Sequence, residues 1–200
     1  MYISQDFNKW FSDRGDETLM LDHKINKESN ILEIGGYKGV WVSHIIEKYN
    51  PNVFIFEPVE EYYNHLCSKF SSNPKVKIFK FGVSNKTQNA NISLIDDGSS
   101  LIFNSDHKEK IELISFDTML DYLNLQNIDL MQINIEGAEY DVLEHAIKNN
   151  LLKNINKIIV QFHTNVEDCY IRRSNIQNKL QEFGYSKLFD YPFIWEGWAK

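Results

Sequence analysis

Short apolar segments alternate with segments of helical periodicity along most of this 200-residue chain. The apolar segments are short and bounded by polar or turn residues, which predicts strands. These strands are expected at 30–34, 53–56, 128–135 and 158–162. Apolar residues at spacings of three or four predict amphipathic helices at 40–49, 59–70, 116–123, 140–149 and 176–183. Strands that alternate with helices favour an α/β fold with a doubly wound, mostly parallel sheet.

The middle of the chain departs from this alternation. Residues 75–83 alternate as one further strand, and the stretch 84–115 then shows short alternating segments around a turn signal at Asp97-Gly98. Strands are expected at 88–95, 101–103 and 111–114. We interpret this stretch as a small β-insertion after the third strand of the main sheet.

No internal repeat or linker interrupts the chain, so we expect a single domain over 1–200. Its core is predicted at 30–164, behind an N-terminal helical cap at 1–29 that contains Phe7, Trp10 and Phe11. That helix could act as a lid or as a contact in a homodimer. A C-terminal helix and aromatic strands follow at 165–200. Their aromatic residues are expected to pack against the last strand or a second copy, with stacking on a sugar as the alternative.

The net charge is −7, and the 21 basic residues are scattered along the chain. A surface that follows phosphates needs clustered lysine and arginine, so nucleic acid is not an expected partner. No apolar run is long enough to span a membrane, and no secretory signal is visible at the start. Two cysteines without ligand spacing are typical of a cytoplasmic protein.

The loop after the first strand, Glu33-Ile34-Gly35-Gly36-Tyr37-Lys38-Gly39, carries the first chemical signal. Its glycines allow a sharp turn and a close approach of a ligand to the backbone. Glu57 ends the second strand, where an acid can accept hydrogen bonds from both ribose hydroxyls of a nucleoside. The glycine spacing differs from that of a dinucleotide fold. The acid two residues before the first glycine, Glu33, suits a cationic amino-acid headgroup. These features favour S-adenosylmethionine over NAD.

The chain resembles the FkbM-type methyltransferases, which transfer methyl groups from S-adenosylmethionine, often to sugar or polyketide hydroxyls. The resemblance spans about residues 30–164 and rests on four segments, with QFH at 161–163 matching the next strand end. The segments are ILEIGGYKG at 31–39, FIFEPVEEYYNHL at 54–66, FGVSNKT at 81–87 and IDLMQINIEGAEYDVLEHA at 128–146. The resemblance implies a class I, Rossmann-like methyltransferase fold, and the insertion with Ser99 and Ser100 also looks like the family.

The resemblance also implies which residues hold the cofactor. Glu33, Gly35, Gly36 and Gly39 would surround its methionine part. Glu57 would hold the ribose with Pro58 beside it, and Gly82 and Val83 would line the adenine. We expect Gly35→Val to abolish cofactor binding and to leave a folded protein.

Two positions depart from the family pattern. Gln132 and Asn134 stand where the family usually has lysine and aspartate. The main hypothesis is an O-methyltransferase that acts on a sugar or polysaccharide hydroxyl, and the expected partner is a small-molecule or carbohydrate acceptor. A catalytically weak S-adenosylmethionine-binding protein and a methyltransferase for a non-sugar hydroxyl remain alternatives.

A sugar hydroxyl is a weak nucleophile, so a nearby base is expected to take its proton. Glu136 and His163 follow the fourth and fifth strands by pattern, and Asn134 could orient the acceptor. We favour His163 as the base, because a neutral imidazole accepts a proton near pH 7. The acidic turn with Asp96, Asp97, Asp106 and His107 is interpreted as a solvated loop, and no metal site is predicted.

Overall fold

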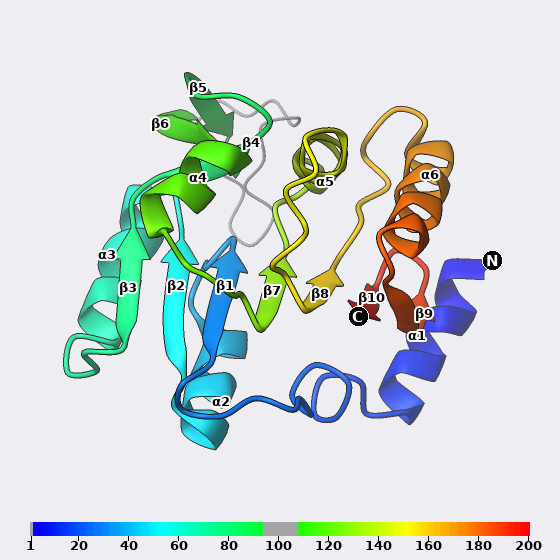
Figure 1. Cartoon of the computed structure of the whole chain (residues 1–200), viewed down its shortest axis with the longest axis horizontal. Helices are drawn as coiled ribbons and strands as arrows, with labels where there is room; N and C mark the ends of the chain where they lie inside the picture. Colours follow the sequence, from blue (N-terminus) through cyan, green and yellow to red (C-terminus); the bar gives the residue numbers. More distant parts are fainter. Residues whose placement is uncertain (1, 94–107) are drawn as a thin grey trace.

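The computed structural model describes residues 2–93 and 108–200 of the chain. Seven strands form one twisted sheet in the order β3-β2-β1-β7-β8-β10-β9 (Figure 1). The first five of these strands run parallel, and β10 is antiparallel to both of its neighbours. The strands of this sheet are β1 (Asn30–Ile34), β2 (Asn52–Phe56), β3 (Val76–Phe79), β7 (Leu130–Ile133), β8 (Lys157–Val160), β9 (Ser186–Tyr191) and β10 (Trp195–Ala199). The prediction of a doubly wound, mostly parallel sheet is confirmed.

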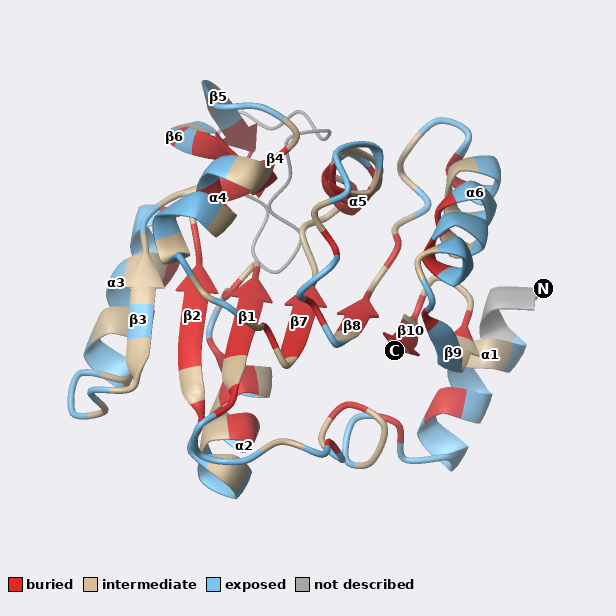
Figure 2. Ribbon diagram, viewed as in Figure 1, coloured by how far each residue is buried: buried red, intermediate tan, exposed pale blue. Residues whose placement is uncertain are grey.

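Helices cover both faces of this sheet, so the domain has three layers. They are α1 (Tyr2–Ser12), α2 (Val40–Tyr49), α3 (Glu60–Lys69), α4 (Phe116–Leu123), α5 (Glu139–Lys148) and α6 (Cys169–Glu182). One core joins a sheet face to α4, α5 and α6, and a second core joins the other face to α1, α2 and α3. The inner parallel strands β1, β2, β7 and β8 are almost entirely buried, as expected for a sheet covered on both sides, whereas the edge strand β3 is only partly buried (Figure 2).

A small three-stranded sheet sits above the carboxyl ends of the main strands, in the order β4-β6-β5 (Figure 1). Its strands are β4 (Gly82–Ser84), β5 (Gln88–Ser93) and β6 (Lys108–Ser115). Its apolar side packs on Val59 and Tyr62 at the start of α3. The expected β-insertion is therefore present, while the strand expected at 101–103 and the residues Ser99 and Ser100 lie outside the described residues.

The prediction of one strand over 75–83 is wrong. The chain bends at 80–81, so β3 stays in the main sheet and β4 pairs with β6 in the small sheet. Gly82 allows this change of sheet because it has no side chain, and the backbone can therefore pass close to its neighbours. A Cβ there would be 2.7 Å from the side chain of Leu113 and 3.4 Å from that of Pro58.

The N-terminal helix packs against the edge of the main sheet. Trp10 is 2% exposed, and its ring meets that of Tyr191 edge to face at 5.1 Å. Phe7 and Phe11 remain exposed on the other side of α1. In the tail, Trp198 is fully buried, which agrees with the expected packing of the C-terminal aromatics.

Within the described ranges, no helix combines the length and the apolar character that crossing a bilayer requires.

Candidate functional site

The loop after β1 brings the ends of β1 and β7 into close contact. Gly35 has a φ of +92°, and a Cβ at this position would lie only 2.0 Å from the carbonyl oxygen of Asn134. The N–H of Asn134 in turn donates to the carbonyl of Ile34 at 3.0 Å. Glycine is required here both for its backbone conformation and for the space. The carboxyl ends of the two central strands therefore form one surface.

Glu57 follows β2 and is 5% exposed. Its Oε2 accepts the N–H of Tyr37 at 2.8 Å, and its Oε1 accepts the N–H of Val59 at 2.9 Å. Burial raises the pKa of Glu57 to about 7, although these N–H groups act in the opposite direction. Each carboxylate oxygen can accept a second hydrogen bond, so Glu57 retains capacity for a ligand.

A first cavity of about 270 Å³ lies beside Glu57, between the main sheet and the small sheet. Its polar lining includes Glu57, Asn134 and Glu136, and Gly82 also reaches it. Its apolar walls come from Ile34, Phe56, Pro58, Val59, Val83, Ile92, Ile111 and Leu113. An apolar slot with a few polar groups at its edge is typical of a small-molecule site.

A second cavity, of about 580 Å³, shares Gly35, Tyr37 and Asn134 with the first. Its walls come from the strands β1 and β7, the start of α2, the segment after α1, and the start of β10. The lining includes Asp16, Glu17, Met20, Leu21, Glu33, Gly36, Gly39, Trp41, His44, Gln132 and Trp195. Neither cavity has a lysine or arginine among its described lining residues, whereas both carry carboxylates.

Three buried acceptor oxygens on residues that line the second cavity have no hydrogen-bond partner within 2–93 and 108–200. They are Oε2 of Glu33, Oε1 of Gln132 and Oδ1 of Asn134. Glu33 and Gln132 are neighbours across β1 and β7, since the strand register pairs them. Burial raises the pKa of Glu33 well above its usual range, and the nearby charge of Glu57 adds to this effect. Buried acceptors without partners cost stability, so such a set indicates a place for a donor-rich ligand.

Glu136, Glu139 and His163 form a connected cluster at the ends of β7 and β8. The Nε2 of His163 lies 3.3 Å from Oε1 of Glu136, and its Nδ1 lies 3.1 Å from Oε1 of Glu139. That oxygen of Glu139 also accepts the backbone N–H of His163 at 2.8 Å. The imidazole is thus held between two carboxylates.

This arrangement contradicts the expectation of a neutral His163 near pH 7. Burial alone would lower the pKa of His163, but hydrogen bonds to Glu136 and Glu139 outweigh it and raise the pKa to about 9. An imidazolium has no free nitrogen to accept a proton. His163 also does not line either cavity, while Glu136 lines the first.

The other predicted site residues divide between the two cavities. Glu57, Pro58, Gly82 and Val83 line the first, while Glu33, Gly36 and Gly39 line the second. Gly35 and Asn134 line both. The two cavities that these residues line are therefore contiguous, as expected for residues that lie at the ends of neighbouring strands.

Sequence reasoning missed several lining residues. Tyr37 lines both cavities, and its ring meets that of Tyr62 edge to face at 4.6 Å. The signal for Tyr37 is its place between the glycines of the loop. The small-sheet residues Ile92, Ile111 and Leu113 could not be placed over Glu57 without knowing how the insertion folds back.

The turn with Asp96, Asp97, Asp106 and His107 lies outside the described residues. Among the residues that the structure does describe, no group of three or more histidine, cysteine or acidic side chains is arranged to hold a metal ion.

The comparisons with known proteins agree with the fold. The family model described as "Methyltransferase FkbM domain" matches residues 33–187. An rRNA methylase from Streptococcus thermophilus aligns with a TM-score of 0.52 at 9% identity, over 88% of this chain and 89% of that one. A fibrillarin pre-rRNA processing protein from Methanococcus jannaschii aligns with a TM-score of 0.53 at 13% identity, over 92% and 75%. The MTase domain of METTL16 aligns with a TM-score of 0.50 at 12% identity, over 99% and 65%. No match was found among curated proteins.

Proposed function

The chain belongs to the FkbM family of methyltransferases, and we propose that it transfers the methyl group of S-adenosylmethionine to a hydroxyl of a carbohydrate. The observation that carries the cofactor assignment is the buried carboxylate of Glu57 on the wall of an apolar cavity. The fold is that of the class I, Rossmann-like methyltransferases.

The first cavity fits the adenosine part of this cofactor. Its apolar walls, with Pro58 and Val83 among them, suit a flat base. The carboxylate of Glu57 would accept hydrogen bonds from the ribose hydroxyls, since it has about four acceptor positions and the backbone N–H groups of Tyr37, Val59 and Gly36 do not use all of them.

The second cavity fits the methionine part. An ammonium group offers three N–H donors, and Glu33, Gln132 and Asn134 offer three buried oxygens without partners in the described chain. The carboxylate of Asp16 on the same lining also favours a cationic ligand, whereas that of Glu17 is paired with Arg14. Gly35 lies where the two cavities join, together with Tyr37 and Asn134, so one cofactor can extend from the first cavity into the second.

When bound, S-adenosylmethionine supplies a methyl group on a positively charged sulfur, which an incoming oxygen displaces in line. The chain must align the acceptor and accept its proton, and alignment alone can supply up to about 7–11 kcal/mol. Glu136 lines the first cavity beside Asn134, so we assign the base to the Glu136 carboxylate. Asn134 would orient the acceptor hydroxyl through its side-chain amide.

The charge of the site supports a neutral or cationic acceptor. The described lining of both cavities contains carboxylates and no lysine or arginine. A nucleic acid would bring phosphates to this surface, and phosphate binding requires basic groups. Two of the three structural neighbours described above are named as rRNA proteins, but at 9% and 13% identity their similarity to this chain concerns the fold alone. Trp41 and Trp195 on the second cavity offer aromatic faces of the kind on which sugars stack.

Calorimetric titration of the purified protein tests the cofactor assignment. S-adenosylmethionine and S-adenosylhomocysteine should bind, and NAD should not. Glu57→Ala should weaken binding roughly 10- to 150-fold, because a charged hydrogen-bond acceptor is worth about 1.5–3 kcal/mol. Glu61→Ala, which removes an exposed carboxylate from the start of α3, is the matched control and should bind normally. Normal affinity in a folded Glu57→Ala protein would refute the assignment.

A transfer assay with tritiated S-adenosylmethionine and a panel of neutral sugars, amino sugars and sugar phosphates tests the acceptor class. Transfer to the first two groups supports the proposal. Transfer only to other hydroxyl compounds supports a non-sugar methyltransferase. Tight cofactor binding without any transfer supports the catalytically weak binding protein, for which Gln132 and Asn134 are the motivation.

A further inference from the structure

We propose that Glu139 is a positioning residue for methyl transfer: it fixes the ring of His163, and that ring fixes the carboxylate of Glu136 at the first cavity. The inference rests on the proposed function, in which Glu136 accepts the proton of the acceptor hydroxyl. It assigns a role to a residue that does not line either cavity.

Glu139 is suited to this role because it is completely buried and rigidly held. It opens α5 and is 0% exposed. Its Oε2 accepts the N–H of Gly137 at 2.9 Å, and its Oε1 accepts the N–H of His163 at 2.8 Å. One carboxylate thus ties the turn after β7 to the end of β8.

The same carboxylate determines which way the His163 ring faces. With Nδ1 at 3.1 Å from Glu139, the opposite ring nitrogen, Nε2, is directed to Glu136 at 3.3 Å. The hydroxyl of Tyr140 donates to the carbonyl of His163 at 2.8 Å and holds its backbone. A histidine whose second nitrogen is fixed by a carboxylate has one defined orientation.

Glu136 needs such support because of its backbone. Its φ of +54° is unusual for a residue with a side chain, and it lies directly before Gly137 with a φ of +108°. Such conformations persist only where the surroundings hold them. The side-chain amide of Asn165 donates to the carbonyl of Glu136 at 3.2 Å, and the His163 ring holds its carboxylate. Glu139 therefore supports the base through one intermediate side chain.

A purely structural role for Glu139 makes a different prediction. An acid in the first turn of a helix is stabilised by the helix dipole and by N–H groups. In that case its replacement would lower stability without moving Glu136 or the rate of transfer.

The test compares Glu139→Gln with Glu144→Gln, which removes a carboxylate from the same helix that pairs with Arg172 instead. In the complex with S-adenosylhomocysteine, NMR should show the pKa of His163 falling from about 9 toward the ordinary 6.5 in Glu139→Gln only. Nuclear Overhauser contacts between the His163 ring and the Glu136 side chain should be lost in the same variant. With a sugar acceptor from the panel, kcat should fall at least tenfold while KM for S-adenosylmethionine stays within twofold.

Each outcome bears on a different claim. Unchanged ring contacts and unchanged kcat in Glu139→Gln would overturn the positioning role. Failure of the unaltered protein to bind S-adenosylhomocysteine would instead refute the proposed function. If Glu139→Gln does not fold, Glu139→Asp keeps the charge on a shorter side chain, and loss of the Glu136 contacts there supports the proposal, whereas their retention overturns it.

Discussion

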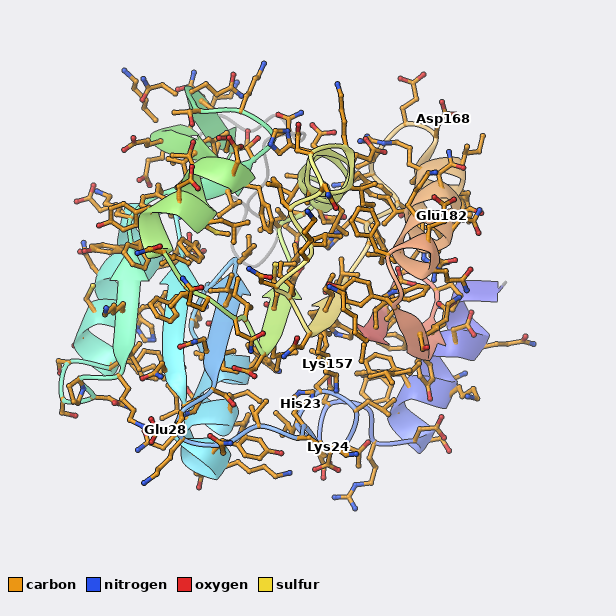
Figure 3. All side chains as sticks on the ribbon, in the orientation of Figure 1. His23, Lys24, Glu28, Lys157, Asp168 and Glu182 are labelled. Atoms are coloured by element: carbon orange, nitrogen blue, oxygen red, sulfur yellow. The ribbon has the colours of Figure 1, made fainter. Side chains whose placement is uncertain are left out.

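The two ends of the main sheet differ in their polar groups: several acceptors at the carboxyl end lack a hydrogen-bond partner in the described chain, although Glu139 there has its own partners. At the amino end, the Asp129 carboxylate accepts the N–H of Asn30 at 2.9 Å and the side-chain amide of Asn127 at 3.0 Å. His23 is paired there as well, through Met20 on one ring nitrogen and Lys157 on the other (Figure 3). At the carboxyl end, Glu33 keeps a buried oxygen with no partner in the described chain, and so do Gln132 and Asn134.

This difference distinguishes polar groups that stabilise the folded chain from polar groups that can bind a ligand. Satisfied polar groups at the amino end fix the chain and add to the free energy of unfolding. Unpaired acceptors at the carboxyl end lower the free energy of unfolding of the ligand-free protein, and a ligand that donates hydrogen bonds to them restores that stability. Matched substitutions at the two ends should therefore have opposite consequences.

The largest expected effect comes from two glycines with similar backbone angles. Gly35, at the carboxyl end, has a φ of +92°, and a Cβ there would lie 2.0 Å from the carbonyl oxygen of Asn134. Gly184, before β9, has a φ of +86° with nothing within 4 Å. Gly35→Ala should lower the free energy of unfolding by about 3 kcal/mol or more, and Gly184→Ala by about 1 kcal/mol. Denaturant titration measures both.

This prediction corrects the expectation that Gly35→Val leaves a folded protein. The added atoms would collide with backbone, which cannot move aside as the end of a side chain can. Loss of cofactor binding in that variant would therefore not separate the loop's binding role from its structural role. Equal losses of stability at Gly35 and Gly184 would show that the backbone angle alone matters.

Two buried histidines should give opposite dependences on pH. The pKa of His163 is raised to about 9, so the folded state keeps its proton longer than the unfolded state. This stabilisation is complete below about pH 6.5 and is lost as pH rises to about 9. Burial and the charge of Lys157 lower the pKa of His23 to about 4, so its stabilisation is complete above about pH 6.5 and is lost as pH falls to about 4.

Each histidine can contribute up to about 3 kcal/mol, at about 1.4 kcal/mol per pKa unit. The free energy of unfolding of His163→Gln, relative to that of the unaltered protein, should increase as pH rises from about 6.5 to about 9. That of His23→Gln should increase as pH falls from about 6.5 to about 4. The pKa of Lys157 is lowered to about 8 by burial, which adds its own slope above that pH. The difference between His163→Gln and the unaltered protein removes this slope. Because Lys157 contacts His23, the His23→Gln curves are compared below about pH 7, where Lys157 stays protonated. Parallel curves for the two variants would contradict the comparison.

The secondary structure was largely predictable because local patterns determine it. The helix expected at 40–49 matches α2, whose ends are marked by Gly39 and Asn50, both in the left-handed region. The strand expected at 128–135 is shorter, since Ile128 forms only an isolated bridge with Ile155 and pairing as a strand begins at Leu130. The apolar pattern alone cannot show where pairing begins.

The candidate site was predictable in position but not in chemistry. The rule that ligand sites follow parallel strands predicts Glu57 and Glu136 at the carboxyl edge, and both line the first cavity there, while Glu33, near the end of β1, lines the second. The charge of His163 depends on Glu136 and on Glu139, which lies 24 positions earlier in the chain and contacts His163 across the turn at Glu136. No spacing rule predicts that contact.

The smallest expected effect compares two carboxylates, Glu33 at the carboxyl end and Asp129 at the amino end. Since the folded-state pKa of Glu33 is raised, its contribution to stability falls as pH rises above about 4.5. At pH 8, Glu33→Gln should therefore raise the free energy of unfolding by about 1–3 kcal/mol and weaken S-adenosylmethionine binding. Asp129→Asn should lower it by about 1 kcal/mol with unchanged binding, because it disturbs a paired group. A Glu33→Gln protein that is less stable yet binds normally would place Glu33 with the structural groups of the amino end, and the ammonium of the cofactor would then need another partner.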